Sequence, residues 1–276
     1  MLIKDIEPHL SLKEFVRKYQ IIRWQYDATA IPPNKTLAPR PEHSLTFYIR
    51  DQQSFSFVNS TKKEYYPKTI ISGIHDKTII RDCGHDFWAL KIIFQPCALF
   101  KLTGLPMKEL VSNYVDAEIV LGYEVRLLQQ RLNSTDNLKE MILIIEIYLQ
   151  HLVKQQKKEH LHIDNICKEI LYQTESKNLD ILAKNSFLST RQFIRKFEER
   201  TGISPKLFDR IVRFDNAYRL KNNQPNLDWL SIALNCGYYD YQHLAKDYND
   251  FTNTTPVRYY EIDKQAPERF FGLHFG

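Results

Sequence analysis

The segment 204–223, which reads SPKLFDRIVRFDNAYRLKNN, constrains the fold of this chain more than any other. Its apolar side chains recur at steps of three and four residues and wrap more than one face of a helix. Ser204 suits the N-cap and Pro205 the first helical position, while Pro225 lies just past the expected end. The pattern predicts one helix about 30 Å long. Because apolar residues cover two faces, we expect this helix to hold two neighbouring units at a fixed separation.

Two similar segments flank this helix, at about 178–201 and about 228–251. In each, an Asn or Asp opens a short helix that ends near an alanine, and a second N-cap opens a helix with apolar residues four apart. The matching positions are Asn178, Ala183, Ser189, Phe193 and Phe197 in the first segment and Asp228, Ala233, Asp240, Leu244 and Tyr248 in the second. Each segment therefore predicts a helix-turn-helix, in which the small alanine lets two helices cross closely.

The first third of the chain has the period of β-strands. Short segments rich in β-branched and aromatic residues are separated by Pro, Gly, Asn and Asp turns. They lie at 19–27, 44–50, 54–58, 68–74 and 88–94. This spacing predicts a small antiparallel sandwich or a partly open barrel. After Pro96 the period becomes helical, and we expect helices at 97–103, 122–133 and 138–155.

These patterns predict an α+β chain. The polar stretch QQKKEHLH at 155–162 is the best domain boundary, and Ile163 begins the first helix after it. We therefore expect a β-rich domain with C-terminal helices at 1–155, an all-helical domain at 161–260 and a tail at 261–276. A length of 276 residues with 43% hydrophobic content is sufficient for two cores.

Positive charge is concentrated in the first helix-turn-helix and the long helix. Residues 184–221 carry 10 Lys or Arg against 4 Asp or Glu, whereas 222–260 carry 2 against 4. A basic surplus of this kind can be an ordinary solvated surface. Combined with the repeated motif, and with a connecting helix close in length to the roughly 34 Å turn of B-DNA, it favours double-stranded DNA as the partner.

The sequence offers little material for catalysis. The four cysteines lack ligand spacing, which predicts reduced and inert thiols. His43, His75 and His85 are isolated, and there is no glycine-rich phosphate loop or nucleophile elbow. We therefore expect neither an enzyme nor a metal or other cofactor. No apolar run approaches a membrane span and the first residues lack a signal peptide's features, so we expect a cytoplasmic protein without a membrane partner.

Base-reading side chains are expected on the outward face of the second helix of each unit. Phe193 and Phe197 should point inward, as should Leu244 and Tyr248. Arg and Gln can form paired hydrogen bonds with guanine and adenine, and Thr or Ile can contact the thymine methyl group. The predicted DNA-binding residues are Thr190, Arg191, Gln192, Ile194, Arg195, Tyr241, Gln242, His243 and Lys246. The alternative, an exposed helical surface without function, is less convincing for two copies than for one.

Residues 161–260 resemble the DNA-binding domain of the AraC/XylS family of bacterial transcription regulators. The resemblance rests on four segments: LDILA (179–183), LSTRQFIRKFEERTGISP (188–205), RFDNAYRL (213–220) and IALNCGYYDYQHLAKDYNDFTNTTP (232–256). It implies two helix-turn-helix units that read successive major-groove segments. Two positions depart from the family pattern. Phe187 replaces a glycine in the first turn, where positive φ is costly for phenylalanine, and Asn253 replaces a late glycine, where asparagine tolerates it.

Residues 87–110, FWALKIIFQPCALFKLTGLPMKEL, resemble part of the sensor domain found ahead of such regulators. The resemblance implies a cupin-like sheet that binds a small-molecule effector or a second subunit, and RNA polymerase as a further partner. Two alternatives stay open: a dimeric regulator that needs no effector, and a cupin-type enzyme with a helical partner-binding module. The apolar stripe of 138–155 predicts a homodimer contact, or equally the packing of this helix on its own sheet.

Overall fold

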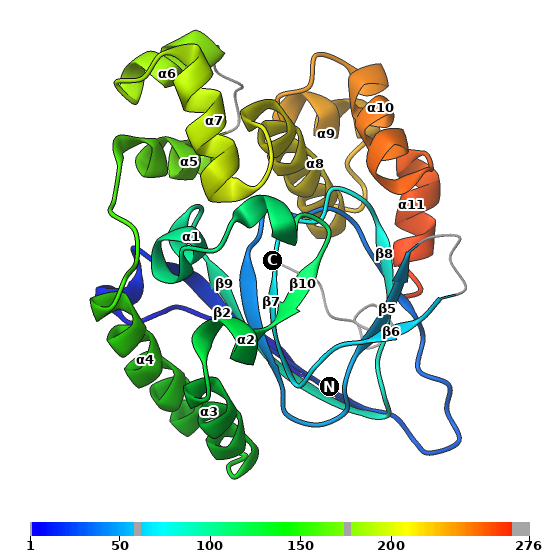
Figure 1. Ribbon diagram of the computed structural model, residues 1–276. Coiled ribbons are helices and arrows are strands. Elements are labelled where there is room, and N and C mark those ends of the chain that lie inside the picture. Colours follow the sequence, from blue (N-terminus) through cyan, green and yellow to red (C-terminus); the bar gives the residue numbers. More distant parts are fainter. Residues whose placement is uncertain (1, 58–61, 174–177, 267–276) are drawn as a thin grey trace.

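The computed structural model describes residues 2–57, 62–173 and 178–266. Two antiparallel sheets with flanking helices form the N-terminal part, and a purely helical part lies on one end of them (Figure 1). This arrangement confirms the expected α+β class. Within the described ranges, no helix is both long and apolar enough to cross a membrane.

The larger sheet has six strands in the order β1-β2-β9-β4-β7-β10, and the smaller has four in the order β3-β8-β5-β6. Every strand pair is antiparallel. The strands are β1 (Leu2–Ile6), β2 (Val16–Gln25), β3 (Lys35–Leu37), β4 (Ser44–Tyr48), β5 (Ser54–Phe57), β6 (Glu64–Tyr65), β7 (Thr69–Ser72), β8 (Ile79–Asp82), β9 (Asp86–Phe94) and β10 (Tyr114–Asp116).

All five predicted strands are present as β2, β4, β5, β7 and β9. The last residue of the predicted segment 54–58 lies outside the described residues. The strands that were not predicted, β1, β3, β6, β8 and β10, are two to five residues long. So few residues do not establish a period of two, and tertiary pairing decides their conformation.

The N-terminal helices cover one face of the six-stranded sheet. They are η1 (Leu10–Leu12), α1 (Ala98–Thr103), η2 (Met107–Leu110), α2 (Ala117–Leu121), α3 (Glu124–Asn133) and α4 (Leu138–Lys154). Tyr19 and Ile21 of β2 pack in one core with Met141, Ile145 and Leu149 of α4. The α4 stripe therefore packs within its own domain, which is the alternative that the sequence left open.

The helical part comprises α5 (His162–Tyr172), α6 (Leu179–Asn185), α7 (Thr190–Thr201), α8 (Pro205–Asn223), α9 (Trp229–Asn235), α10 (Tyr241–Thr252) and α11 (Pro256–Asp263). Its residues form a second core, to which the N-terminal domain contributes Ala38, Ile74 and Cys97. Helix α11 was not predicted as a separate element, and it continues past residue 260. Residues 267–276 of the expected tail lie outside the described residues.

The two parts are joined by direct hydrogen bonds near both helix-turn-helix units. His43 Nε2 lies 3.2 Å from the carbonyl oxygen of Thr201, at the end of α7. Thr78 Oγ1 donates to the carbonyl oxygen of Phe251 in α10 at 2.8 Å. A Cβ atom at Gly202 would lie 2.5 Å from the carbonyl oxygen of Met107, so only glycine allows this approach. The helical part is thus joined to the N-terminal part at α7 and at α10.

Candidate nucleic-acid interface

The two predicted helix-turn-helix units have matching turns. The amide of Leu188 donates to the carbonyl oxygen of Ala183 at 3.1 Å, and the amide of Tyr238 donates to that of Ala233 at 3.0 Å. Both alanines are buried, which lets the paired helices cross closely. Phe187, for which positive φ is costly, adopts a φ of 56° nonetheless. The first turn therefore has the same geometry as the second.

Helix α8 connects the units as predicted. Ser204 Oγ caps it by accepting from the amide of Leu207 at 3.3 Å, and Pro205 opens it. Arg210 joins it to α10, because its Nε and Nη2 donate to Asp247 Oδ1 at 2.9 and 2.7 Å. At about 1.5 Å per residue, the 19 residues of α8 extend about 28 Å.

Helix α7 presents two arginines to solvent. Ser189 caps it, and Phe193 and Phe197 are fully buried beneath. Arg191 and Arg195 are exposed and make no hydrogen bond or ion pair with the part of the chain that the structure describes. An open hollow of about 910 Å³ lies along this half of the helix. Both guanidinium groups are therefore available to a partner.

Two other predicted residues of α7 also serve its own N-terminus. Thr190 Oγ1 donates to Asp180 Oδ1 at 2.7 Å. Gln192 Oε1 accepts from the amide of Ser189 at 3.1 Å and so completes a capping box. Ile194 is half-buried. The side-chain amide nitrogen of Gln192 is therefore the atom of this residue best placed to donate a hydrogen bond to a partner.

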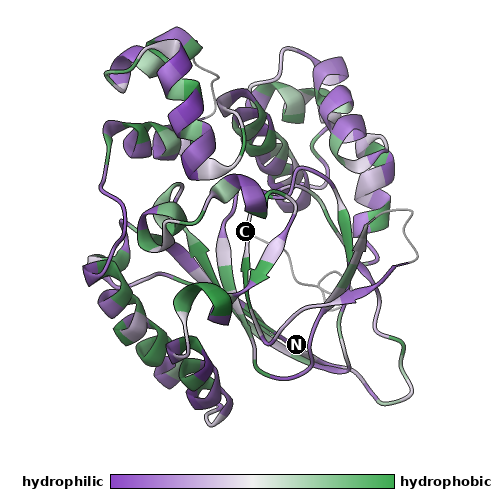
Figure 2. Ribbon diagram, viewed as in Figure 1, coloured by the Kyte–Doolittle hydropathy of each residue, from purple (hydrophilic) through white to green (hydrophobic). Residues whose placement is uncertain are grey.

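In the second unit, α10 presents a less basic surface. Gln242, His243 and Lys246 are exposed, whereas Tyr241 packs against the helical core. Asp240 caps the helix by accepting from the amide of His243 at 2.8 Å, and His243 Nδ1 lies 2.9 Å from the same carboxylate oxygen. Helices α7 and α10 both begin on the side remote from the two sheets (Figure 1), and Figure 2 shows hydrophilic residues along both.

Pairing inside the domain redistributes the charge counted from the sequence. Half of the ten cations in 184–221 are held internally: Arg200 by Asp164, Arg210 by Asp247 and Asp250, Arg213 by Asp209, Arg219 by Asp215, and Lys221 by the carbonyl oxygens of Pro225 and Leu227. The others are Lys184, Arg191, Arg195, Lys196 and Lys206, for which the described structure shows no ion pair. The positive charge that is available to a partner thus gathers around α7.

Lys184 and Lys206 were not among the predicted contacts. They lie at the end of α6 and the start of α8, on either side of α7 in the chain. The local excess of basic residues was the sequence feature that could have indicated these two lysines, but such an excess does not distinguish exposed cations from paired ones. Among the described residues, no group of three His, Cys, Asp or Glu side chains could hold a metal ion.

Two helix-turn-helix units on one connecting helix define the class of the C-terminal domain, which is a double helix-turn-helix domain. Residues 182–261 match a family model described as a helix-turn-helix domain, and residues 4–116 match one described as a domain of unknown function, DUF6597. The C-terminal domain is therefore an AraC-type helix-turn-helix domain, which confirms the resemblance stated above for this part of the chain.

A curated relative is an uncharacterized HTH-type transcriptional regulator of Haemophilus influenzae, which is 32% identical over 83 residues. The match covers 30% of this chain and 27% of that protein, so the chain spans about a quarter of its relative's length.

Two solved structures are among those to which this chain shows similarity. The DNA-binding domain of AdpA in complex with a target DNA is 21% identical, with 38% of this chain and 95% of that chain covered and a TM-score of 0.35. ToxT from Vibrio cholerae is 10% identical, with 88% and 98% covered and a TM-score of 0.48.

Proposed function

We propose that this protein is a one-component transcription regulator that binds a specific DNA sequence by inserting α7 and α10 into successive major-groove segments. The observation that carries the proposal is the exposure of Arg191 and Arg195 on α7, without internal partners among the described residues. An unpaired arginine on the first half of a reading helix suits paired hydrogen bonds to guanine.

The residues that we propose to contact DNA are those expected from the sequence, but they differ in how much of each side chain is available. Arg191, Arg195 and Lys246 have their charged groups free of internal ion pairs among the described residues. Gln192 uses its side-chain oxygen in a contact with the capping residue Ser189, and His243 uses Nδ1 in a contact with the capping residue Asp240. The other polar atom of each side chain, the amide nitrogen of Gln192 and Nε2 of His243, would therefore face DNA.

We also propose that the N-terminal domain controls DNA binding through an effector, through dimerisation, or through both. Dimerisation is supported by α4, which exposes Leu143 and Ile147 one helical turn apart beside its buried stripe. Control of RNA polymerase is the output expected of such a regulator. An enzyme is not favoured, because no catalytic constellation was found in the sequence.

A gel-shift titration with DNA selected from a random library tests the proposal. We expect saturable binding that competitor DNA of random sequence does not remove, and a fall in affinity as salt rises. Equal affinity for selected and random DNA would contradict sequence-specific regulation.

A further inference from the structure

Tyr239, which was not among the predicted contacts, lies directly before the cap of α10. Its side chain is 85% exposed. Its hydroxyl group makes no hydrogen bond with the residues that the structure describes. Its ring approaches the ring of His243 edge-on, with the centroids 5.9 Å apart. Both the hydroxyl and most of the ring are therefore open to a molecule outside the chain.

The second unit has one residue more than the first between its turn and its reading helix. In the first unit the cap Ser189 directly follows Leu188, the residue whose amide closes the turn. In the second unit Tyr239 stands between the corresponding residue, Tyr238, and the cap Asp240. Asp240 accommodates the extra residue in an extended conformation, with φ −157° and ψ 179°. Tyr239 therefore has no counterpart in the first unit.

The residue before Tyr239 is anchored in the interior. Tyr238 is buried, and it donates its hydroxyl hydrogen to Asp247 Oδ2 of α10 at 3.1 Å. Because Tyr238 fixes the chain on the inside, the extra residue after it is left on the surface. Helix α10 begins on the side remote from the two sheets (Figure 1), so Tyr239 lies beside the proposed DNA surface.

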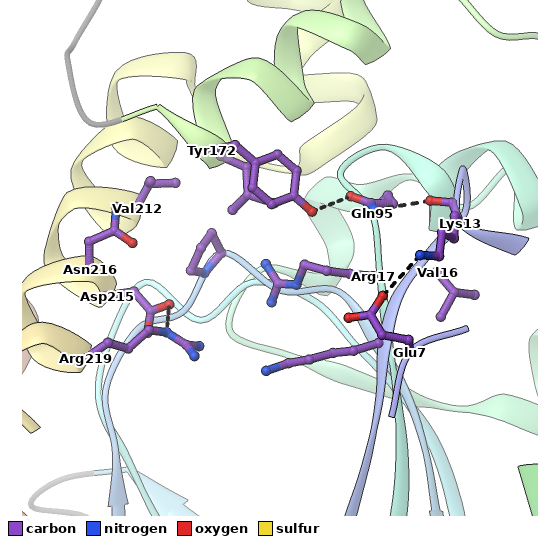
Figure 3. Close-up of a pocket in the computed structure, with 13 residues that line it drawn as sticks. Glu7, Lys13, Val16, Arg17, Gln95, Tyr172, Val212, Asp215, Asn216 and Arg219 are labelled. Atoms are coloured by element: carbon purple, nitrogen blue, oxygen red, sulfur yellow. Dashed lines mark hydrogen bonds and ion pairs between the residues drawn. The ribbon is translucent and has the colours of Figure 1, made fainter. Parts of the chain in front are cut away.

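A second exposed tyrosine of the helical part has an internal partner for its hydroxyl group. Tyr172 of α5 donates its hydroxyl hydrogen to Gln95 Oε1 of the N-terminal domain at 3.1 Å. This contact lies in a cleft of about 400 Å³ between β2 and α8 (Figure 3). Tyr172 thus joins the two parts of the chain, whereas the hydroxyl of Tyr239 has no such use among the described residues.

The charge at the start of α10 limits how this unit can bind a phosphate. A helix N-terminus attracts anions, but here the capping residue is itself a carboxylate. The backbone amide and the ring of His243 contact Asp240 and hold the pKa of its carboxyl below the ordinary value, so Asp240 is ionised. In α7, by contrast, the cap is the neutral Ser189. A phosphate near α10 is best bound by a neutral donor that keeps it away from Asp240.

We propose that Tyr239 contacts the DNA backbone and donates its hydroxyl hydrogen to a phosphate oxygen at the edge of the groove that α10 enters. Its ring carries the hydroxyl group away from the Asp240 carboxylate, and the same ring supports the ring of His243. This inference rests on the proposed function and adds to it a contact that does not depend on the base sequence. The hydroxyl carries no charge and releases no counterion, so the contact also does not depend on salt as lysine contacts do.

DNA titrations with the full-length Tyr239→Phe variant test this contact, because the change removes the hydroxyl group and keeps the ring. We expect affinity for the selected DNA to fall about fivefold, the loss expected for one hydrogen bond of ordinary net strength. The loss should be the same on DNA in which only the base pairs facing α10 are exchanged. The slope of log affinity against log salt should not change. Tyr65→Phe, at an exposed tyrosine of β6, is the matched control and should bind as the unchanged protein does.

A neutral linkage in the DNA identifies the phosphate that Tyr239 contacts. A methylphosphonate replaces each phosphate beside the α10 segment in turn, and at one position Tyr239→Phe should cause little further loss of affinity. Melting curves establish that the variants fold.

Three results would overturn the contact and leave the proposed function intact. They are equal affinity of Tyr239→Phe and the unchanged protein, a loss confined to the selected bases, and an equal loss in Tyr65→Phe. A loss that persists with every methylphosphonate would exclude a phosphate as the acceptor and so also overturn it. Failure of the unchanged protein to bind the selected DNA would refute the proposed function, and the contact with it.

Discussion

Phe187 in the first turn takes the left-handed backbone conformation that Gly237 takes in the second, with φ values of 56° and 76°. The left-handed region costs a residue with a Cβ atom about 1–2 kcal/mol. The ring of Phe187 is 78% exposed, and its closest aromatic contact is edge-on with His162 at 4.9 Å between centroids. Little packing therefore offsets the strain in this turn.

Phe187→Gly should raise the free energy of unfolding by up to about 1 kcal/mol, because relief of strain exceeds the added entropy of the unfolded chain. Phe187→Ala is the matched control, since it removes the ring and keeps the Cβ atom. Urea unfolding of both variants measures the difference. If the glycine variant is no more stable than the alanine variant, the turn is not strained.

The first helix-turn-helix unit should contribute more to DNA affinity than the second. Arg191→Ala or Arg195→Ala should each lower affinity for the selected DNA at least about tenfold, because a paired arginine contact contributes about 1–3 kcal/mol. Gln242→Ala and His243→Ala should cost less and mainly change sequence preference. Titrations at two salt concentrations measure these losses.

The control for these variants is Arg131→Ala, which removes an exposed cation of α3 far from the reading helices. Its affinity for the selected DNA should equal that of the unchanged protein. Melting curves establish that each variant folds. Equal losses from both units, or a larger loss from α10, would refute the asymmetry.

The exposed side of α4 should form a contact between two copies of the chain. Ile147→Asp places a charge on this surface, whereas the buried stripe of Met141, Ile145 and Leu149 is left unchanged. We expect sedimentation of the unchanged protein at micromolar concentration to show a dimer, and that of the variant to show a monomer. A monomer in both cases would mean that α4 only packs on its own sheet.

Acid should weaken the interface between the domains through His43. Burial lowers the pKa of His43 to about 4, although the hydrogen bond that His43 donates to the Thr201 carbonyl oxygen acts in the opposite direction, while an unfolded histidine titrates near 6.5. Between about pH 4 and pH 6.5 this histidine binds more protons in the unfolded chain than in the folded chain. The contribution of neutral His43 to the free energy of unfolding is therefore fully present above about pH 6.5 and falls as the pH drops toward 4.

His43→Gln keeps an N–H donor for the Thr201 carbonyl but cannot be protonated. Its Tm should fall less than that of the unchanged protein between neutral pH and about pH 5. His85→Gln, at an exposed histidine, is the control and should behave like the unchanged protein. An unaltered pH profile in His43→Gln would show that this histidine does not limit acid stability.

Long periodic segments were predictable from the sequence, because they contain enough residues to establish a pattern. Helix α8 was expected at 204–223 and is found at Pro205–Asn223, and the caps Ser189 and Asp240 lie where they were expected. The helix-turn-helix turns could also be located from their alanines. The two turns differ in their residue at positive φ, yet tertiary packing gives them one geometry.

The interior of the N-terminal domain was not predictable in the same way. Lys91 is part of the apolar segment 88–94, and its pairing with Glu42 depends on a loop and a strand far apart in the chain. Nor did the sequence indicate that half of the basic residues in 184–221 have internal acidic or carbonyl partners. Such pairings depend on three-dimensional contacts, which a linear count of charge does not contain.

Hydroxyl-radical footprinting on DNA selected from a random library tests the central claim most directly. If α7 and α10 read successive major-groove segments, the protein will protect two patches about one helical turn apart on the same face of the duplex. Arg191→Ala will weaken the patch that α7 contacts more than the patch that α10 contacts. Protection of a single patch, or uniform protection without a selected sequence, would contradict the account.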